Sequence, residues 1–370
     1  MEQSNHRTSA KLQVDSNQVS FYKSIYPVFI MLAGLILACE APKTNDQEYP
    51  EKTKMETKMP YPTAGEIVRL DDAINALLPL GASIEIIADS FVWSEGPVWV
   101  ESEQMVLFSD IPPNKIYKWT EGGGLEEYLH PSGYTGEGEY SYEPGSNGLI
   151  IGSNGELLMC QHGDRRIAQM DAPLDAPQAK FSTITDRWDG KRFNSPNDLI
   201  QLRNGDIIFT DPPYGLPKQA EDPSREIPFQ GVYHYSASTQ KTTLLTDEMS
   251  RPNGLAVSPD ESKLYVANSD PKQAIWMVFD WDGTQLSNGG VFYDATSLVG
   301  SQKGLPDGLK VDQNGHVWAT GPGGVWVFNK DGQALAQIKT GQATSNCAFD
   351  TDQSTFYMTA DMYLMRIRLK

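Results

Sequence analysis

The chain has 370 residues, of which 39% are hydrophobic, so it is long enough to bury the core of one large domain or of two ordinary ones. Its formal charge of −18 at pH 7 excludes nucleic acids and anionic lipid surfaces as its main partners, since both would repel it. The 32 glycines and 24 prolines favour many short strands joined by turns.

The first element along the chain is an uncharged run of fourteen residues, Ile25–Ala38, which follows Lys23 and ends at Cys39. This length is typical of the core of a signal peptide and is short for a membrane span. The last five residues of this stretch, ending in the cysteine, resemble the lipobox of bacterial lipoproteins. We therefore expect residues 1–38 to be a lipoprotein-like signal peptide and the protein to be exported. It would lie in the periplasm or be tethered to the outer membrane through lipidated Cys39, the alternatives being an ordinary cleaved signal or a short uncleaved anchor.

Residues 39–80 follow as a linking region. Up to about Thr63, lysine, glutamate, proline and threonine dominate the composition. Such a segment cannot bury enough apolar surface to fold by itself, and it predicts a flexible tether ahead of the folded body.

The remainder, residues 81–370, contains a repeat. Six segments share a polar residue followed by a short apolar strand, and the intervals between these polar residues are 52, 50, 56, 54 and 39. A second and a third strand follow each of them, separated by turn residues. We call the six polar residues the ring residues: Glu95, Asn147, Asn197, Asn253, Asp307 and Asn346.

Repeats of this length and number predict an all-β fold, a six-bladed β-propeller. The last repeat lacks a fourth strand, whereas Ser83–Ala88 precedes the first repeat and belongs to none. We expect this N-terminal strand to join the last blade and so close the ring, which would cover both edges. A β-sandwich and a β-helix are the alternatives.

In a propeller the innermost strands run side by side along one channel, so the ring residues should converge at its mouth. Two carboxylates facing each other in one small volume would repel and lose solvation unless a cation lay between them. Oxygen ligands without cysteine or histidine favour Ca²⁺ or Mg²⁺, with Ca²⁺ the best match and Mn²⁺ or Zn²⁺ as substitutes. The alternative is structural, because Asn-Gly and Asp-Gly pairs are common in turns.

Five motifs carry a resemblance to a known family: Ser94–Trp99, Asn194–Leu199, Phe209–Gly215, Arg251–Leu255 and Leu305–Leu309. In this order they are similar to motifs of the gluconolactonase/regucalcin (senescence marker protein) family, and most similar to its bacterial gluconolactonase branch. The resemblance covers roughly residues 80–370. It implies a six-bladed propeller with one divalent ion, calcium or a related metal, that hydrolyses sugar lactones or related esters.

Carried over by motif, the resemblance implies Glu95, Asn253 and Asp307 as metal ligands. Asn197 would be a fourth ligand or a residue that contacts substrate. One position departs from the pattern: the bacterial branch often has an acidic residue before His162, where this chain has Gln161. This departure leaves the substrate preference open.

The expected reaction is attack of water on a lactone carbonyl that the cation polarises. Asp307 is the candidate general base, or a ligand alone. His162 is the second candidate catalytic residue, as an orienting group or proton shuttle, or else a structural histidine. Four side chains are expected to contact sugar hydroxyls of the substrate: Asn194, Asn197, Asp211 and Tyr214. The alternative for Asn194, Asp211 and Tyr214 is that they stabilise turns. The insertion Gly136–Gly148 is expected to overhang the channel with its acidic residues solvated.

Three functions therefore compete. The first is hydrolysis of a small sugar lactone, the second a phosphotriesterase or arylesterase reaction at the same ion, and the third a non-catalytic, calcium-stabilised propeller that binds a glycan or protein. The chain has no Gly-x-Ser-x-Gly elbow, phosphate-binding glycine loop or His-Glu-x-x-His motif. Serine-hydrolase, nucleotide-binding and zinc-protease functions lack support accordingly.

Overall fold

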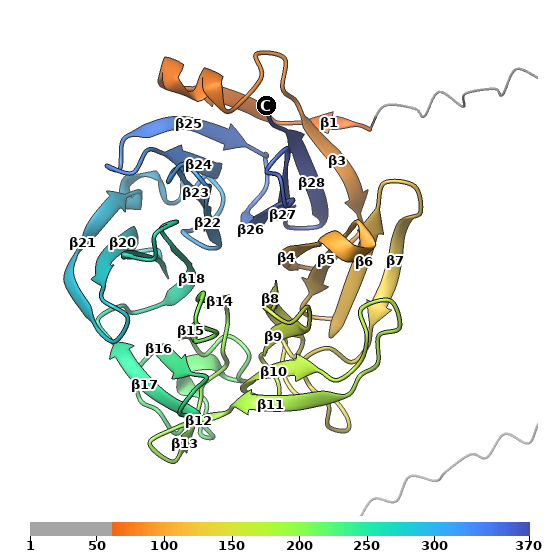
Figure 1. The fold of residues 1–370 in the computed structure, drawn as a ribbon, viewed down its shortest axis with the longest axis vertical. Coiled ribbons are helices and arrows are strands. Elements are labelled where there is room, and N and C mark those ends of the chain that lie inside the picture. Colours follow the sequence, from red (N-terminus) through yellow and green to blue (C-terminus); the bar gives the residue numbers. More distant parts are fainter. Residues whose placement is uncertain (1–60) are drawn as a thin grey trace, which may run out of the picture. The chain divides into compact units, whose positions relative to one another are not determined.

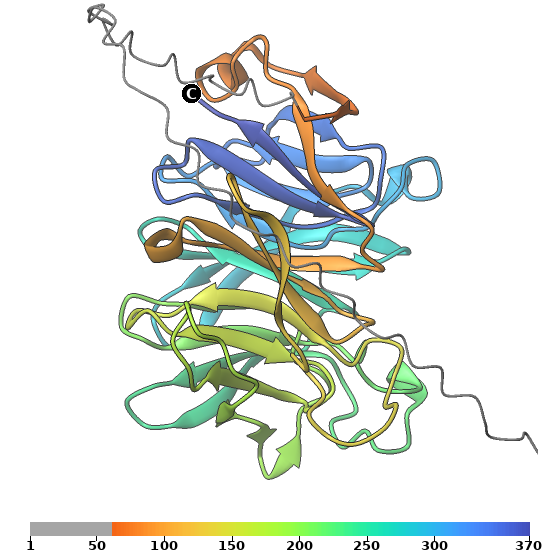
Figure 2. The same cartoon turned by 90° about the vertical axis from the view of Figure 1, so that its right-hand side faces the viewer.

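The computed structural model describes residues 61–370, so the predicted signal peptide, Cys39 and residues 39–60 of the predicted tether lie outside the described residues. Within residues 61–370 the secondary structure is β-strand apart from four short 3₁₀ helices. Six antiparallel sheets of four or five strands are arranged in a ring around a central axis (Figure 1), which confirms the six-bladed propeller. From the side, the sheets are seen as twisted blades (Figure 2).

The blades are numbered in chain order, and the strands of each blade are given from the innermost to the outermost. Blade one contains β4 (Ser94–Val100), β5 (Met105–Asp110), β6 (Lys115–Thr120) and β7 (Gly124–Leu129). Blade two contains β8 (Ser146–Ile151), β9 (Leu157–Gln161), β10 (Arg166–Met170) and β11 (Phe181–Thr185). Blade three contains β14 (Leu199–Gln201), β15 (Ile207–Asp211), β16 (Gly231–Ser236) and β17 (Lys241–Thr246). The two-stranded sheet before it pairs β12 (Arg187–Trp188) with β13 (Lys191–Arg192).

The second half of the chain forms the other three blades. Blade four contains β18 (Pro252–Val257), β19 (Lys263–Asp270), β20 (Gln273–Trp281) and β21 (Leu286–Asp294). Blade five contains β22 (Leu309–Val311), β23 (Val317–Gly321), β24 (Gly324–Phe328), β25 (Ala334–Lys339) and β2 (Glu66–Arg69). Blade six contains β26 (Thr344–Phe349), β27 (Thr355–Ala360), β28 (Tyr363–Arg368), β3 (Ile84–Asp89) and β1 (Thr63–Ala64). The 3₁₀ helices are η1 (Asp72–Ala76), η2 (Glu101–Glu103), η3 (Gln219–Glu221) and η4 (Thr296–Leu298).

Blade six combines strands from both ends of the described chain. Strand β28 pairs antiparallel with β3, with Tyr363 opposite Asp89 and Arg366 opposite Glu85. The Arg366 Nε donates to a Glu85 carboxylate oxygen over 2.6 Å, which ties the two strands together by a charged contact. The outer part of this blade therefore comes from residues that precede blade one.

Residues 61–80 differ from the expected tether, because they pack against blades five and six. Strand β2 extends blade five by pairing with β25, and β1 extends blade six by pairing with β3. The reason is local apolar content: Ile74 and Leu78 are fully buried in the core between these blades, and Ile67 is partly buried against it. The predicted tether therefore ends before residue 80.

Apolar side chains fill the spaces between neighbouring blades. One such cluster joins Trp318 of blade five to Phe356 and Met358 of blade six, all nearly or fully buried. Close packing of this kind leaves little freedom to the strands that line the channel. Among the described residues, no helix is long and apolar enough to cross a membrane.

Candidate functional site

The ring residues lie where the innermost strands begin. Glu95, Asn147 and Asn253 are the second residues of β4, β8 and β18. Asn197 and Asp307 lie two residues ahead of β14 and β22. These five residues line one cavity of about 180 Å³ at the mouth of the channel, as the repeat predicted.

Asn346, the sixth ring residue, does not line this cavity. Its side-chain amide donates to the Asp198 carboxylate over 3.4 Å, and its side-chain oxygen accepts from the Cys347 N–H over 2.9 Å. The Lys310 ammonium also donates to this oxygen, over 3.4 Å. Asn346 therefore serves a buried polar network inside the channel.

Hydroxyl groups on second strands hold the ring backbone in place. The Ser109 hydroxyl of blade one donates to the Asn147 carbonyl of blade two over 2.9 Å. The Thr210 hydroxyl of blade three donates likewise to the Asn253 carbonyl of blade four over 2.7 Å. Because these donors and acceptors are buried, breaking one bond would leave an unsatisfied polar group. Blades one and three thereby fix the ring residues of blades two and four.

The glycines that follow ring residues allow the blades to approach each other closely. A Cβ at Gly96, whose φ is +48°, would stand 2.1 Å from the Asn147 carbonyl oxygen. A Cβ at Gly254 would stand 2.4 Å from the Asp307 carbonyl oxygen. The pairs that resemble turn signals in the sequence are thus required by packing around a narrow channel.

Three oxygen atoms around the cavity have no hydrogen-bond partner among the described residues. They are buried side-chain oxygens of Asn147, Asn197 and Asp307. An unsatisfied buried acceptor costs free energy, so three at one cavity favour a ligand that accepts lone pairs. Together with the Glu95 carboxylate, these are hard oxygen donors, which match a divalent ion such as Ca²⁺.

The two carboxyl groups are held in an environment that disfavours their charge. Burial raises the pKa of Glu95 to about 8, with the Asp198 charge adding to this effect. Burial and the neighbouring Glu95 raise the pKa of Asp307 well above its ordinary value. A bound cation would reverse both effects. Within residues 61–370 no group of three or more His, Cys, Asp or Glu side chains is arranged to hold a metal ion, so amide oxygens must complete any site here.

These raised pKa values predict how stability depends on pH. In ion-free protein the unfolded Glu95 loses its proton near pH 4.5, but the folded Glu95 keeps it to about pH 8. The free energy of unfolding should therefore fall as the pH rises through this window. Calcium would replace the proton, so its stabilising effect should be larger at about pH 8 than at about pH 5. Melting temperatures in chelator and in excess calcium test this, and an equal calcium effect at both pH values would contradict it.

His162 lies behind the ring and not on the cavity wall. Its side chain is fully buried, and its Nε2 lies 3.5 Å from the amide nitrogen of Asn197. Burial lowers the pKa of His162 to about 4, so the ring is neutral at pH 7. By contacting the Asn197 nitrogen, His162 turns the Asn197 oxygen toward the cavity.

Two of the predicted substrate residues lie outside the cavity wall. The Asp211 carboxylate accepts from the backbone N–H groups of Asn194 and Ser195, each over 2.8 Å. The Asn194 amide donates to the Phe229 carbonyl over 2.9 Å. Asn194 and Asp211 thus hold the segment that carries Asn197, whereas Tyr214, predicted with them, does line the cavity.

The structure adds cavity residues that the sequence did not single out. Trp93, Arg251 and Ser269 line the cavity beside the ring residues. Glu143 lines it too, and its side chain is 24% exposed, although the acidic residues of its insertion were expected to be solvated. Burial raises the pKa of Glu143 to about 7. Trp93 immediately precedes the motif Ser94–Trp99, and Arg251 is the first residue of the motif Arg251–Leu255, which is the signal that could have indicated them.

Known proteins resemble this chain in sequence and in fold. Residues 93–361 match the profile described as "SMP-30/Gluconolactonase/LRE-like region". A gluconolactonase of Zymomonas mobilis subsp. mobilis is 38% identical over 322 residues, covering 83% of this chain and 87% of that protein. The solved structure of a gluconolactonase from Xanthomonas campestris is similar with a TM-score of 0.71 and 30% identity, over 85% of this chain and 99% of that one.

A more distant structure shares the fold. Regucalcin from Agrobacterium tumefaciens, described as a calcium-binding protein, superimposes with a TM-score of 0.60 at 18% identity. The match covers 77% of this chain and 94% of that one.

Proposed function

The chain belongs to the SMP-30/gluconolactonase/LRE-like family, and we propose that it hydrolyses sugar lactones with the help of a divalent cation. The proposed ligands are Glu95, Asn197, Asn253 and Asp307, and the proposed ion is Ca²⁺, with Mg²⁺, Mn²⁺ or Zn²⁺ as substitutes. The observation that carries this proposal is the set of buried, unsatisfied oxygens of Asn147, Asn197 and Asp307 around one cavity. Asn147 extends the proposed set of ligands, since it lines the same cavity and its side-chain oxygen has no hydrogen-bond partner.

The proposed chemistry uses groups that line the cavity. When bound, a divalent ion would polarise the lactone carbonyl and stabilise the developing oxyanion. The Asp307 carboxylate oxygen that has no hydrogen-bond partner would face the ion, and the other oxygen of the same carboxylate would take a proton from the attacking water. The water oxygen bonds to the carbonyl carbon, the ring carbon–oxygen bond breaks, and the ring oxygen takes up a proton to give a hydroxy acid.

His162 and Tyr214 support this reaction from different positions. Neutral His162 holds the Asn197 amide so that its oxygen faces the cavity. Tyr214 lines the cavity, and burial raises the pKa of its hydroxyl, so it remains a neutral donor for a substrate oxygen.

A substrate panel tests the proposal. We expect purified protein to hydrolyse aldonolactones such as glucono-1,5-lactone faster than aryl esters or phosphotriesters. Greater activity on phosphotriesters or aryl esters would indicate the second enzymatic function. Hydrolysis of none of these compounds, with calcium binding intact, would favour a non-catalytic binding propeller.

We also propose that the protein is exported and anchored by lipid at Cys39, on the basis of the Ile25–Cys39 segment alone. Fractionation of cells that express the Cys39→Ala variant tests this. Membrane association that is unchanged by the substitution would contradict lipidation at this residue.

A further inference from the structure

The loop between β7 and β8, residues 130–145, brings the carboxylate of Glu143 to the cavity. The proposed reaction does not use this carboxylate. Glu143 lines the cavity together with the apolar side chains of Ile111 and Leu305. Its carboxylate accepts no hydrogen bond from the described residues, and its Oε2 lies 3.8 Å from His162 Nδ1. A carboxylate left free in this way is an acceptor for hydrogen-bond donors of a ligand.

Glu143 lies beside the proposed ion site and is not part of it. No three His, Cys, Asp or Glu side chains of residues 61–370 are arranged around a common ion position. Glu95, Asp307 and Glu143 therefore do not converge on one cation, although all three line the cavity. Glu143 is partly exposed and lines the same cavity as the ring residues, so a substrate bound in this cavity would lie beside its carboxylate.

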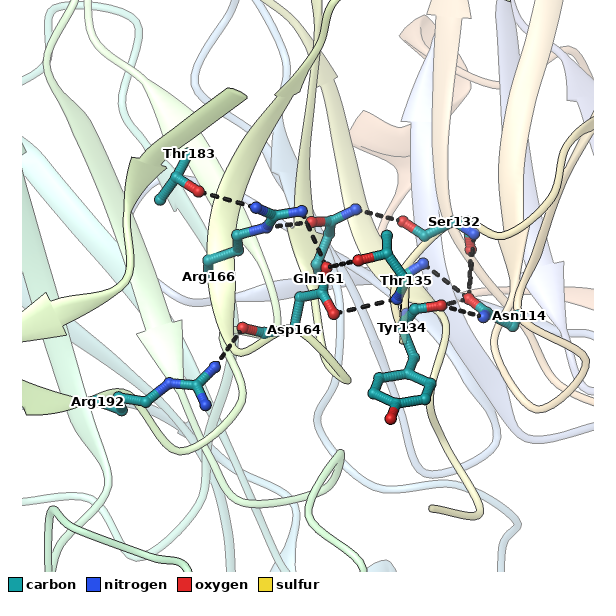
Figure 3. Close-up of polar contacts among 10 residues, drawn as sticks. Asn114, Ser132, Tyr134, Thr135, Gln161, Asp164, Arg166, Thr183 and Arg192 are labelled. Carbon is teal, nitrogen blue, oxygen red and sulfur yellow. Dashed lines mark hydrogen bonds and ion pairs between the residues drawn. The ribbon is translucent and has the colours of Figure 1, made fainter. Parts of the chain in front are cut away.

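Hydrogen bonds hold this loop in one conformation (Figure 3). The Asn114 side-chain oxygen accepts from the backbone N–H groups of Ser132 and Gly133, over 3.1 Å and 2.7 Å. The Asn114 amide donates to the Tyr134 carbonyl over 2.8 Å. Thr135 donates to the Asp164 carboxylate through both its backbone N–H and its hydroxyl. These hydrogen bonds fix the start of the loop, residues 132–135, and preorganisation of this kind lowers the entropic cost of recognition.

Gln161, the residue that departs from the family pattern, belongs to this network. Its amide nitrogen donates to the Ser132 carbonyl over 2.8 Å, and its oxygen accepts from Arg166 Nε over 2.6 Å (Figure 3). A glutamate here could keep the contact with Arg166 but could not donate to Ser132 when ionised. The glutamine therefore fixes the start of the loop that carries Glu143.

We propose that Glu143 selects polyhydroxylated lactones by accepting hydrogen bonds from ring hydroxyls, and that Gln161 positions the loop that presents it. The proposal rests on the proposed lactonase function. A carboxylate accepts two donors side by side, which matches adjacent hydroxyls on a sugar ring. When it is ionised, the same group disfavours substrates that carry phosphate or carboxylate groups.

The test compares two lactones with the same six-membered ring, glucono-1,5-lactone and δ-valerolactone, which lacks hydroxyls. Glu143→Gln should lower kcat/KM for the hydroxylated lactone about 10-fold, mainly through KM, because charge-assisted hydrogen bonds are lost. Turnover of δ-valerolactone and calcium affinity should stay close to wild type. Glu139→Gln is the matched control, since Glu139 is an exposed carboxylate on the same loop.

Gln161→Glu provides an independent variant. It should raise KM for glucono-1,5-lactone while kcat, calcium affinity and δ-valerolactone turnover remain near wild type, because the ion ligands do not move. Loss of activity on both lactones alike would contradict the positioning role.

The remaining outcomes separate this inference from the proposed function. An equal loss on both lactones in Glu143→Gln, or a loss of calcium affinity, would overturn the specificity role. Wild-type protein that hydrolyses neither lactone would overturn the proposed function itself, and this inference with it.

Discussion

Asp307→Asn is expected to lower kcat for glucono-1,5-lactone about 10³-fold, which is in the range for loss of a general base. The amide keeps an oxygen that can face the ion but cannot take a proton from water. The substitution also removes one of the two negative charges that would bind the cation. Initial rates at saturating substrate over a calcium series measure the effect.

Glu95→Gln separates the ligand role from the proton-transfer role. This variant removes the negative charge of one carboxylate in the cavity, as Asp307→Asn does, but it leaves the Asp307 carboxylate in place. Its activity should fall at low calcium and return as calcium is raised, whereas Asp307→Asn should stay inactive. An Asp307→Asn variant that recovers wild-type kcat at saturating calcium would show that Asp307 is a ligand alone.

The architecture could be predicted because its cause is repeated along the chain. Four of the six ring residues are followed by glycine, and each blade needs apolar strands, so similar segments recur at similar intervals. The same repetition placed Glu95, Asn147, Asn197, Asn253 and Asp307 on one cavity. Such agreement depends on equivalent positions in equivalent strands.

Features outside the repeat were predicted less well. Glu143 belongs to a single insertion, and nothing local indicates that hydrogen bonds to Asn114 and Gln161 turn its loop over the channel. Residues 61–80 carry apolar side chains such as Ile74 and Leu78, whose partners lie in blades five and six, far along the chain. Both depend on contacts between residues distant in sequence.

Motif membership also does not separate residues that contact a ligand from those that hold the motif together. Asn194 and Asn197 lie three residues apart in the motif Asn194–Leu199, yet only Asn197 lines the cavity. The Asn194 side chain is engaged by the Phe229 carbonyl and by Arg225. The sequence alone does not show which polar side chains already have partners in the fold.

Removal of the ion is the other change with a large expected effect. Without a cation, burial and mutual repulsion keep Glu95 and Asp307 from both being charged near neutral pH, so the base is lost together with the group that polarises the carbonyl. Chelator-treated protein should therefore lose nearly all turnover, and added calcium should restore it. Addition of magnesium to the same chelator-treated protein serves as the comparison.

The central claim is that hydrolysis depends on a cation held by the ring residues. Its most direct measurement is the rate of glucono-1,5-lactone hydrolysis by protein that has been stripped with EDTA and desalted, corrected for spontaneous hydrolysis, before and after addition of calcium. The account predicts a rate indistinguishable from the spontaneous one before addition and full recovery afterwards. Full turnover by the stripped protein would contradict it.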